Sequence, residues 1–204
     1  MEMTTLAAFL AVDLLLVFTP GADWAYAISA GLRDRSVVPA VAGLIAGYVG
    51  YTLLAVAGLV VIVANSATVL TALTVAGAGY LVWLGCGVLR RPATLTASEE
   101  TMGSSRTQIM LKGMGISGLN PKALLLYFSL FPQFINPAGG WPVAAQTGLL
   151  GTLHMTACAL VYLAVGVLAR TVLKTRPSAA RAVTRVSGAM MIAIGVFLLA
   201  ERLA

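Results

Sequence analysis

Charged residues are scarce in this chain of 204 residues, because Asp, Glu, Lys and Arg together make up only 10% of it. A soluble protein usually contains about a quarter of such residues, so the scarcity argues against a water-soluble domain. Hydrophobic residues make up 59%, and the stretches from Ser36 to Leu89 and from Ala123 to Ala169 contain no charged side chain. Each stretch is long enough for two helical spans of about 20 residues. The composition predicts an all-α polytopic membrane protein.

Cysteine and histidine are also rare. Cys86 and Cys158 each stand alone in an apolar run, and His154 is the only histidine. A metal-ion exporter would require a cluster of carboxylate, His or Cys ligands, and a membrane thiol-redox enzyme would require paired cysteines. Both remain alternatives that the sequence disfavours, so we expect no metal site and two replaceable cysteines. For His154 we expect a packing or hydrogen-bonding role rather than titration during transport.

Sequence signatures of enzymes and of nucleic-acid binding are missing. The chain contains no Gly-x-x-x-x-Gly-Lys-Ser/Thr nucleotide loop and no Gly-x-Ser-x-Gly hydrolase elbow. We therefore expect no enzymatic activity, no ATP hydrolysis and no cofactor. The net charge of +6 does not indicate a nucleic-acid partner, because the basic residues stand at the ends of apolar stretches rather than in a patch among aromatics.

The positions of the basic residues predict the topology. Of the 13 lysines and arginines, only Lys122 and Arg202 lie outside the connectors that follow the first, third and fifth expected spans. Cytoplasmic connectors are enriched in Lys and Arg, so we expect six spans with both termini outside the cytoplasm. The expected spans cover about residues 4–32, 37–63, 69–89, 113–135, 143–169 and 186–200, with a hydrophilic cytoplasmic loop at 90–112.

Prolines interrupt the first and the fourth expected span, at Pro20/Gly21 and at Asn120/Pro121. A proline removes a backbone donor and frees carbonyls that lipid cannot satisfy, so each break predicts a cavity lined by protein. In the expected topology the two halves run in opposite directions and form two inverted three-helix repeats. Broken helices at matching positions of inverted halves indicate a substrate site near the membrane midplane. The repeats cover about residues 1–89 and 113–204 of a single transmembrane domain, 1–204.

Three charged side chains lie inside the expected spans: Lys122, Asp13 and Asp23. Such a charge costs at least a few kcal/mol unless it is paired or hydrated, which makes each a candidate functional residue. Lys122 could bind the carboxylate of a substrate, pair with one of the acids, or snorkel to an interface. Asp23 could hold the substrate's ammonium group, exchange a proton with it, or cap the second half-helix. Asp13 could carry a proton or stay neutral in the membrane.

Uncharged polar groups surround the two breaks. Asn120 and the carbonyls freed by Pro20 and Pro121 could bind polar groups of a substrate, or Asn120 could only repair the broken backbone. Thr19, beside the first break, and Tyr127 complete the candidate substrate site. For Tyr127 the alternative is packing.

A stripe of small residues follows the second expected span, where Gly43, Gly47 and Gly50 are spaced by four and three residues. Such stripes allow two helices to approach each other closely. The partner could be another helix of this chain or a second copy, so a homodimer remains an alternative.

Several of these motifs resemble those of the LysE/RhtB family of amino-acid exporters. The first is Thr19-Pro20-Gly21-Ala22-Asp23, in which Ala22 replaces a second proline of the family's motif. The others follow in the family's order: the run from Gly77 to Gly85, Leu119-Asn120-Pro121-Lys122 and Phe131-Pro132-Gln133-Phe134. The resemblance covers nearly the whole chain.

The resemblance implies secondary active efflux of amino acids, or of close derivatives, across the cytoplasmic (inner) membrane of a bacterium. It further implies proton antiport, for which alternating access around the two breaks is the mechanism we expect. The expected partners are a small-molecule amino acid, protons and the lipid bilayer. Within this set, Lys122 and Asp23 with Asn120, Thr19 and Tyr127 would bind the substrate, and Asp13 and Asp23 would couple protons.

Overall fold

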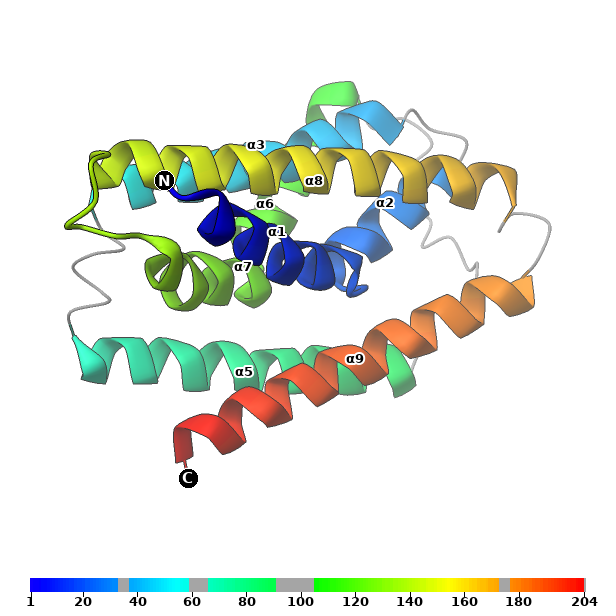
Figure 1. The fold of residues 1–204 in the computed structure, drawn as a ribbon. Helices are drawn as coiled ribbons and strands as arrows, with labels where there is room; N and C mark the ends of the chain where they lie inside the picture. The colour runs from blue at the N-terminus through cyan, green and yellow to red at the C-terminus, as the bar shows by residue number, and fades with distance from the viewer. Residues whose placement is uncertain (33–36, 59–65, 91–104, 173–176, 204) are drawn as a thin grey trace.

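The computed structural model describes residues 1–32, 37–58, 66–90, 105–172 and 177–203. Within these ranges the chain forms helices and no strand, which confirms the predicted all-α class. Figure 1 shows the helices, which are α1 (Met3–Phe18), α2 (Ala22–Leu32), α3 (Val37–Val56), α5 (Ala67–Arg90), α6 (Arg106–Gly118), α7 (Pro121–Leu125), the π-helical turn η1 (Leu126–Leu130), the 3-10 turn η2 (Phe131–Phe134), α8 (Val143–Thr171) and α9 (Pro177–Leu203).

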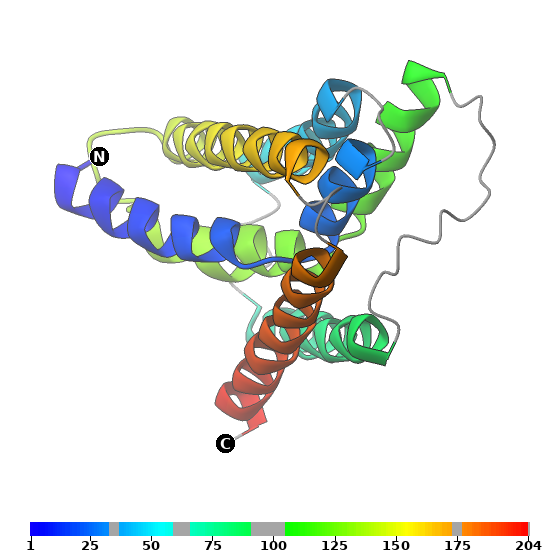
Figure 2. The same ribbon diagram turned by 90° about the vertical axis from the view of Figure 1, so that its right-hand side faces the viewer.

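The helices form two groups that meet along α7 and η1. In the first group α3 packs against α6 and α8, and α2 also packs against α8. In the second group α5 pairs with α9, and α5 reaches the first group through α7 and η1. Figures 1 and 2 show the α5–α9 pair lying apart from α3 and α8 in both views. Among the described residues, the main buried apolar cluster joins the first group to α1, α7 and the η turns, and its most deeply buried members include Phe9, Leu44, Tyr127, Leu150 and Tyr162.

Three segments of the described chain have the length and composition of a membrane span. The helices α3 and α8 are each long and apolar enough to cross a bilayer. The helices α1 and α2 qualify together as one span that is bent by 53° at the break between them. These apolar helices fit a membrane protein, and the full count of six spans remains a prediction.

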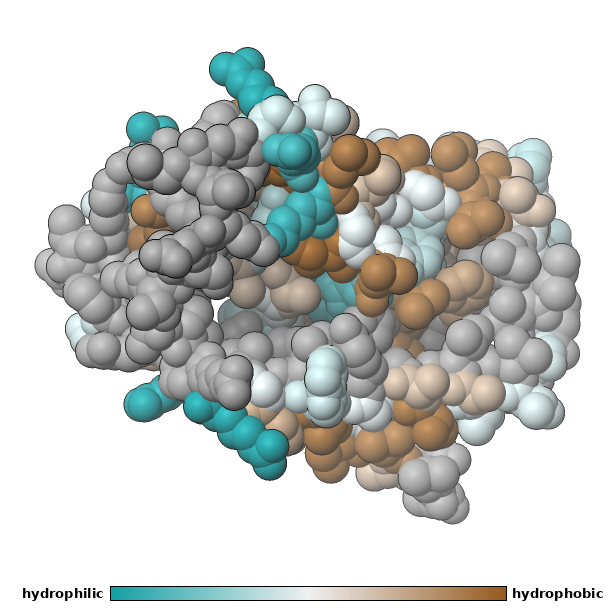
Figure 3. All heavy atoms as spheres, turned by 180° about the vertical axis from the view of Figure 1, so that it is seen from behind, coloured by the Kyte–Doolittle hydropathy of each residue, from teal (hydrophilic) through white to brown (hydrophobic). Residues whose placement is uncertain are grey.

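The two ends of the molecule differ in character. In Figure 1 the N-terminus and the end of α9 lie on the left, whereas α2, α5 and α8 end and α9 begins on the right. Arg90 occupies the last turn of α5 and Arg170 the last turn of α8, where a cation is favoured by the helix dipole. On the face shown in Figure 3 most strongly hydrophilic side chains gather toward one end, and apolar residues cover most of the rest.

Both predicted helix breaks are present. The first helix ends at Phe18, and the backbone N–H of Thr19 closes it by donating to the carbonyls of Leu15 and Leu16, each at 3.1 Å. In the second break α6 ends at Gly118 and α7 begins at Pro121. A proline fits the first position of a helix, where its missing N–H would have no intrahelical partner. Each proline therefore acts as the sequence predicted.

The helix α6 begins earlier than composition suggested. Residues 106–112, which we expected in the hydrophilic loop, form its first turns. The reason is a capping box, in which Ser105 Oγ accepts from the Gln108 N–H at 3.2 Å and Gln108 Oε1 accepts from the Ser105 N–H at 2.9 Å. The rest of the expected loop, residues 91–104, lies outside the described ranges.

Two other boundaries also differ. The helix α9 begins at Pro177, so Arg181 and Arg185 belong to a helix rather than to the expected basic connector. The helix α3 ends at Val56, before the expected end at residue 63, and Gly58 follows with φ +92°. That conformation suits glycine, which explains why the regular helix does not continue. Residues 59–63 lie outside the described ranges.

The glycine stripe on α3 packs within the chain. A Cβ atom added at Gly43 would lie 2.1 Å from the carbonyl oxygen of Met110, and one at Gly47 would lie 2.2 Å from Ser117 Oγ. Both partners belong to α6, and Ser117 Oγ also donates to the Leu44 carbonyl at 2.6 Å. Of the two alternatives for this stripe, Gly43 and Gly47 therefore serve an intrachain contact.

Candidate functional site

A buried carboxylate lies at the junction of the two breaks. Asp23, in the first turn of α2, is only 2% exposed. Its Oδ2 accepts hydrogen bonds from Tyr48 Oη at 2.5 Å, Asn120 Nδ2 at 3.1 Å and Tyr162 Oη at 3.2 Å. Its Oδ1 is buried and has no hydrogen-bond partner among the described residues. Three donors hold one oxygen in place and leave the other available to a ligand.

Asn120 connects the two breaks directly. Its side-chain oxygen accepts from the backbone N–H of Lys122 at 3.0 Å and so caps α7. Its amide nitrogen donates to Asp23, which lies just past the first break. Asn120 therefore both repairs the broken backbone and belongs to the polar cluster around Asp23.

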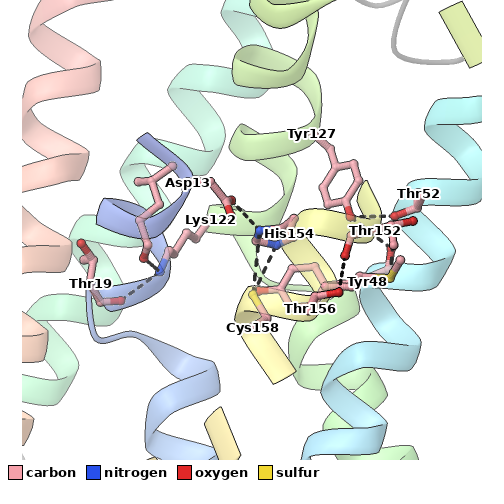
Figure 4. Close-up of polar contacts among 12 residues, drawn as sticks. Asp13, Thr19, Tyr48, Thr52, Lys122, Tyr127, Thr152, His154, Thr156 and Cys158 are labelled. Atoms are coloured by element: carbon pink, nitrogen blue, oxygen red, sulfur yellow. Dashed lines mark hydrogen bonds and ion pairs between the residues drawn. The ribbon is translucent and has the colours of Figure 1, made fainter. Parts of the chain in front are cut away.

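Lys122 binds the carbonyl end of the first broken helix. Its ammonium group donates to the carbonyl oxygen of Leu16 and, at 2.9 Å, to that of Thr19. Figure 4 shows the side chain reaching across to this part of the chain. Among the described residues Lys122 forms no ion pair with either acid. Since an ammonium group has three donors, one N–H remains for another acceptor.

The second intramembrane acid is paired with the histidine. Asp13, on α1, is fully buried, and its Oδ1 lies 2.7 Å from His154 Nδ1 on α8. Its Oδ2 is buried without a hydrogen-bond partner in the described chain. The imidazole ring of His154 meets the ring of Tyr48 edge-on, with centroids 4.7 Å apart. His154 thus has the hydrogen-bonding role that we expected, and its partner is an acid.

Contacts along one face of α8 join the two acids. His154 Nε2 lies 3.5 Å from Cys158 Sγ, a contact that Figure 4 marks with a dashed line. The same sulfur lies 3.6 Å from Tyr162 Oη. Tyr162 in turn donates to Asp23. The three residues of α8 are spaced by four, so they lie one above another on the helix. This spacing is visible in the sequence and is the signal that could have found Tyr162 and Cys158, which sequence reasoning did not place in the site.

The remaining two candidates lie one step from this cluster. Thr19 Oγ1 donates to the Leu15 carbonyl at 2.7 Å, so its side chain helps to close α1. Tyr127 is fully buried, and its hydroxyl lies 2.7 Å from Thr52 Oγ1. Its ring stacks on that of Tyr51, with centroids 5.4 Å apart. No hydrogen bond joins either side chain to Asp23.

A small cavity adjoins the cluster. It is lined by Leu16, Val17, Tyr48, Lys122, Ala123, Leu126, His154 and Tyr162. It has room for about one water molecule, which is too little for an amino acid. A substrate could therefore occupy this cavity only after the surrounding helices move.

The alternatives of a metal site and of paired thiols find no support in the described residues. No group of three or more His, Cys, Asp or Glu side chains is arranged there to hold a metal ion. Cys86 and Cys158 are both free, and they lie on different helices, α5 and α8.

Comparison with known proteins gives the family. Residues 14–202 match the family model described as LysE type translocator. The chain belongs to the LysE family. The resemblance seen in the motifs is thereby confirmed, and it extends over almost the whole sequence.

Individual relatives agree with this assignment. This LysE-family chain is 34% identical over 164 residues to an uncharacterized membrane protein of Vibrio cholerae serotype O1, covering 79% of this chain and 78% of the relative. It is 26% identical over 199 residues, 96% of each chain, to the homoserine/homoserine lactone efflux protein of Salmonella typhimurium. It is 27% identical over 150 residues to the leucine efflux protein of Klebsiella pneumoniae, covering 72% of this chain and 71% of the relative. No solved structure gives a significant match.

The family consists of membrane transporters rather than enzymes, as its description and these efflux proteins indicate. The prediction that this chain is a membrane transporter and not an enzyme is confirmed at that level.

Proposed function

We propose that this LysE-family protein exports amino acids, or close derivatives, across the cytoplasmic membrane of a bacterium in exchange for protons. The observation that carries the proposal is the pair of incomplete charged groups at the two helix breaks. Asp23 has a buried oxygen without a partner, and Lys122 has one N–H still to satisfy. An anion and a cation held apart in an apolar protein match the two charged ends of a zwitterion.

The binding mode follows from these unfilled positions. The ammonium group of the substrate donates to Asp23 Oδ1, and its carboxylate accepts from Lys122 Nζ. An unpaired buried carboxylate oxygen is costly, and a charged donor offsets that cost. Asn120 keeps the two breaks together, while Thr19 and Tyr127 support the helix end and the aromatic wall beside the site.

The relatives support this choice of cargo. Proteins named for the efflux of homoserine, leucine and threonine are similar to this chain over most of its length. The amino and carboxyl groups are common to all amino acids, and they are the groups that the charged pair addresses. We therefore expect other residues around the cavity to recognise the side chain of the cargo.

Transport proceeds by alternating access. Six spans form two inverted repeats, about residues 1–89 and 113–204, which rock around the breaks and open the site to one side at a time. The closed cavity supports an occluded state between the two openings. Both termini face outward, a placement favoured by the basic helix ends at the opposite end of the molecule.

The test is counterflow in proteoliposomes at equal pH. The vesicles contain unlabelled threonine, leucine or homoserine, and the same compound is added outside in labelled form. We expect wild type to exchange at least one of them, with competition from other amino acids. Lys122→Ala and Asp23→Asn each remove one half of the charged pair and should abolish exchange in protein that remains folded by circular dichroism and gel filtration. Lys112→Ala and Glu2→Gln are the matched controls, because both positions are exposed and lie away from the cavity.

Two results would contradict the proposal. Wild-type exchange rates in a folded Lys122→Ala or Asp23→Asn variant would remove that residue from the binding site. A folded wild-type protein that exchanges none of the 20 standard amino acids, homoserine or homoserine lactone would overturn the proposed cargo.

A further inference from the structure

The proposed mode of substrate binding assigns no role to His154. It is buried within α8, 3% exposed, and pairs with Asp13 across the helix interface. An uncompensated ionisable side chain in this environment would be costly, and this one is held between a carboxylate and a polar chain that ends on Asp23. The two acids of the membrane interior are thus connected through an imidazole, a side chain that can bind and release a proton.

The groups that face His154 come from every helix around it. Asp13 faces it from α1, Tyr48 from α3 and Tyr127 from η1. The ring centroids of Tyr127 and His154 are 5.8 Å apart. Lys122, from α7, lines the same cavity, and Cys158 and Tyr162 follow on α8. Among these groups Asp13 is the only acid that contacts the ring, and the hydrogen bonds of Lys122 go to the carbonyl oxygens of Leu16 and Thr19 rather than to His154 or Asp13.

The hydrogen bonds between His154 and Asp23 have a defined direction when the imidazole is doubly protonated. The Tyr162 hydroxyl donates to Asp23, so its oxygen is free to accept from the Cys158 thiol. The sulfur can then accept from His154 Nε2, while Nδ1 donates to Asp13. A neutral imidazole that donates from Nδ1 has a lone pair at Nε2, which draws the thiol proton away from Tyr162. Protonation of the imidazole therefore determines whether the Tyr162 oxygen accepts a hydrogen bond from the Cys158 thiol while the Tyr162 hydroxyl donates to Asp23.

We propose that His154 carries the proton that is exchanged for substrate, with Asp13 as its positioning partner and Cys158–Tyr162 as its link to Asp23. This inference rests on the proposed function and names a residue for its coupling step. In each cycle one proton binds at Nε2 when the site opens outward and leaves from Nε2 when it opens inward. The Nδ1 proton stays on the Asp13 bond, no electrons move, and the net charge of the Asp13–His154 pair alternates between −1 and zero.

The experiment separates coupling from exchange. Wild type and His154→Gln are compared in proteoliposomes with whichever of labelled threonine, leucine and homoserine the wild type exchanges. For each protein we measure uptake with an interior-acid pH gradient and divide it by uptake at equal pH. Glutamine keeps hydrogen-bonding capacity but does not titrate, so the expected result is several-fold stimulation in wild type and a ratio of about one in His154→Gln.

Companion variants test the chain of contacts. Asp13→Asn should also bring the ratio toward one, because it removes the carboxylate that holds the imidazolium. Cys158→Ser should keep the wild-type ratio, since a hydroxyl can donate and accept in the same place. Cys86→Ser, on α5, is the matched control and should change nothing.

The outcomes are distinguishable. Wild-type stimulation in folded His154→Gln overturns the inference and leaves the proposed function standing. A wild type that exchanges substrate without any response to the pH gradient overturns both the inference and the proton antiport of the proposed function, and only amino-acid exchange then stands. Loss of exchange and stimulation together in folded His154→Gln and Asp13→Asn also overturns the inference, because the pair would then belong to the substrate site. If wild type exchanges no amino acid, the proposed function itself fails.

Discussion

Glycine allows close backbone contact both around the site, as at Gly43 and Gly47 on α3, and between α5 and α9, but the helices around the site also bury polar side chains between them. Around the site the interfaces contain buried polar side chains, among them Asp13, Asp23, Thr52, Gln146 and His154. Between α5 and α9 the backbones come close at glycine: a Cβ at Gly85 would lie 2.6 Å from the Gly188 carbonyl oxygen, and one at Gly195 would lie 2.7 Å from that of Ala78.

The difference separates packing from chemistry. Close backbone contact leaves no room for a ligand, and it gains stability from dispersion and close approach. Buried polar groups cost stability unless they are satisfied, so an incomplete one such as Asp23 Oδ1 is a candidate for binding a ligand. We propose that α5–α9 is a scaffold and that transport takes place among the helices that surround the two breaks.

The largest effect should follow from disturbing the α5–α9 contact. Gly85→Leu would force a side chain against the Gly188 carbonyl oxygen and Ile192, so the pair must separate. Overpacking of this kind costs about 1–3 kcal/mol or more. We expect a large loss of folded protein, measured as the monodisperse fraction in detergent and as the midpoint of thermal unfolding.

The control lies on the same helix. A Cβ at Gly87 meets nothing within 4 Å, so Gly87→Leu should fold like wild type. Equal behaviour of the two variants would contradict the role given to the close contact at Gly85.

A smaller effect, seen mainly in the exchange rate, should follow from a substitution in the polar cluster around Asp23. Tyr162→Phe removes one of the three hydrogen bonds to Asp23 Oδ2 and the acceptor of the Cys158 thiol. A hydrogen bond to a charged group contributes about 1.5–3 kcal/mol, which corresponds to roughly a tenfold or greater loss of exchange rate. The measurement is counterflow at equal pH, expressed per amount of folded protein, with the unfolding midpoint recorded beside it.

Tyr26→Phe is the matched control. It removes a hydroxyl that donates to the Ile109 carbonyl at 2.6 Å, away from the cavity lining. It should lower the unfolding midpoint and leave exchange unchanged. The reverse pattern, with exchange lost in Tyr26→Phe and kept in Tyr162→Phe, would contradict the placement of the substrate site at the polar cluster around Asp23.

Much of the fold could be predicted because the determining signals are local. Scarce charge indicates the membrane, and Pro20 and Pro121 break their helices by covalent geometry alone. The early start of α6 was also readable, since Ser105 followed by Gln108 three residues later is a capping-box pattern. Hydrophilic composition hid it, because polarity does not distinguish a loop from the first turns of a capped helix.

The partners of the acids were beyond the sequence. Asp13 and His154 lie 141 positions apart and meet only because α1 packs against α8. The same holds for Lys122, whose ammonium binds carbonyls more than 100 positions earlier rather than a carboxylate. Intramembrane charge identified these residues as candidates, but which groups they face depends on how the helices are rotated and packed.

The most direct test of the central claim is a binding cycle that matches each charged end of the substrate with its residue. Displacement of a labelled amino acid bound at equilibrium to the purified protein is measured for the intact amino acid, for the corresponding amine without the carboxylate, and for the corresponding 2-hydroxy acid without the ammonium group. We predict that wild type prefers the intact amino acid, that Lys122→Ala no longer distinguishes it from the amine, and that Asp23→Asn no longer distinguishes it from the hydroxy acid. Undiminished discrimination in both folded variants would contradict the claim that these two residues bind the charged ends of the cargo.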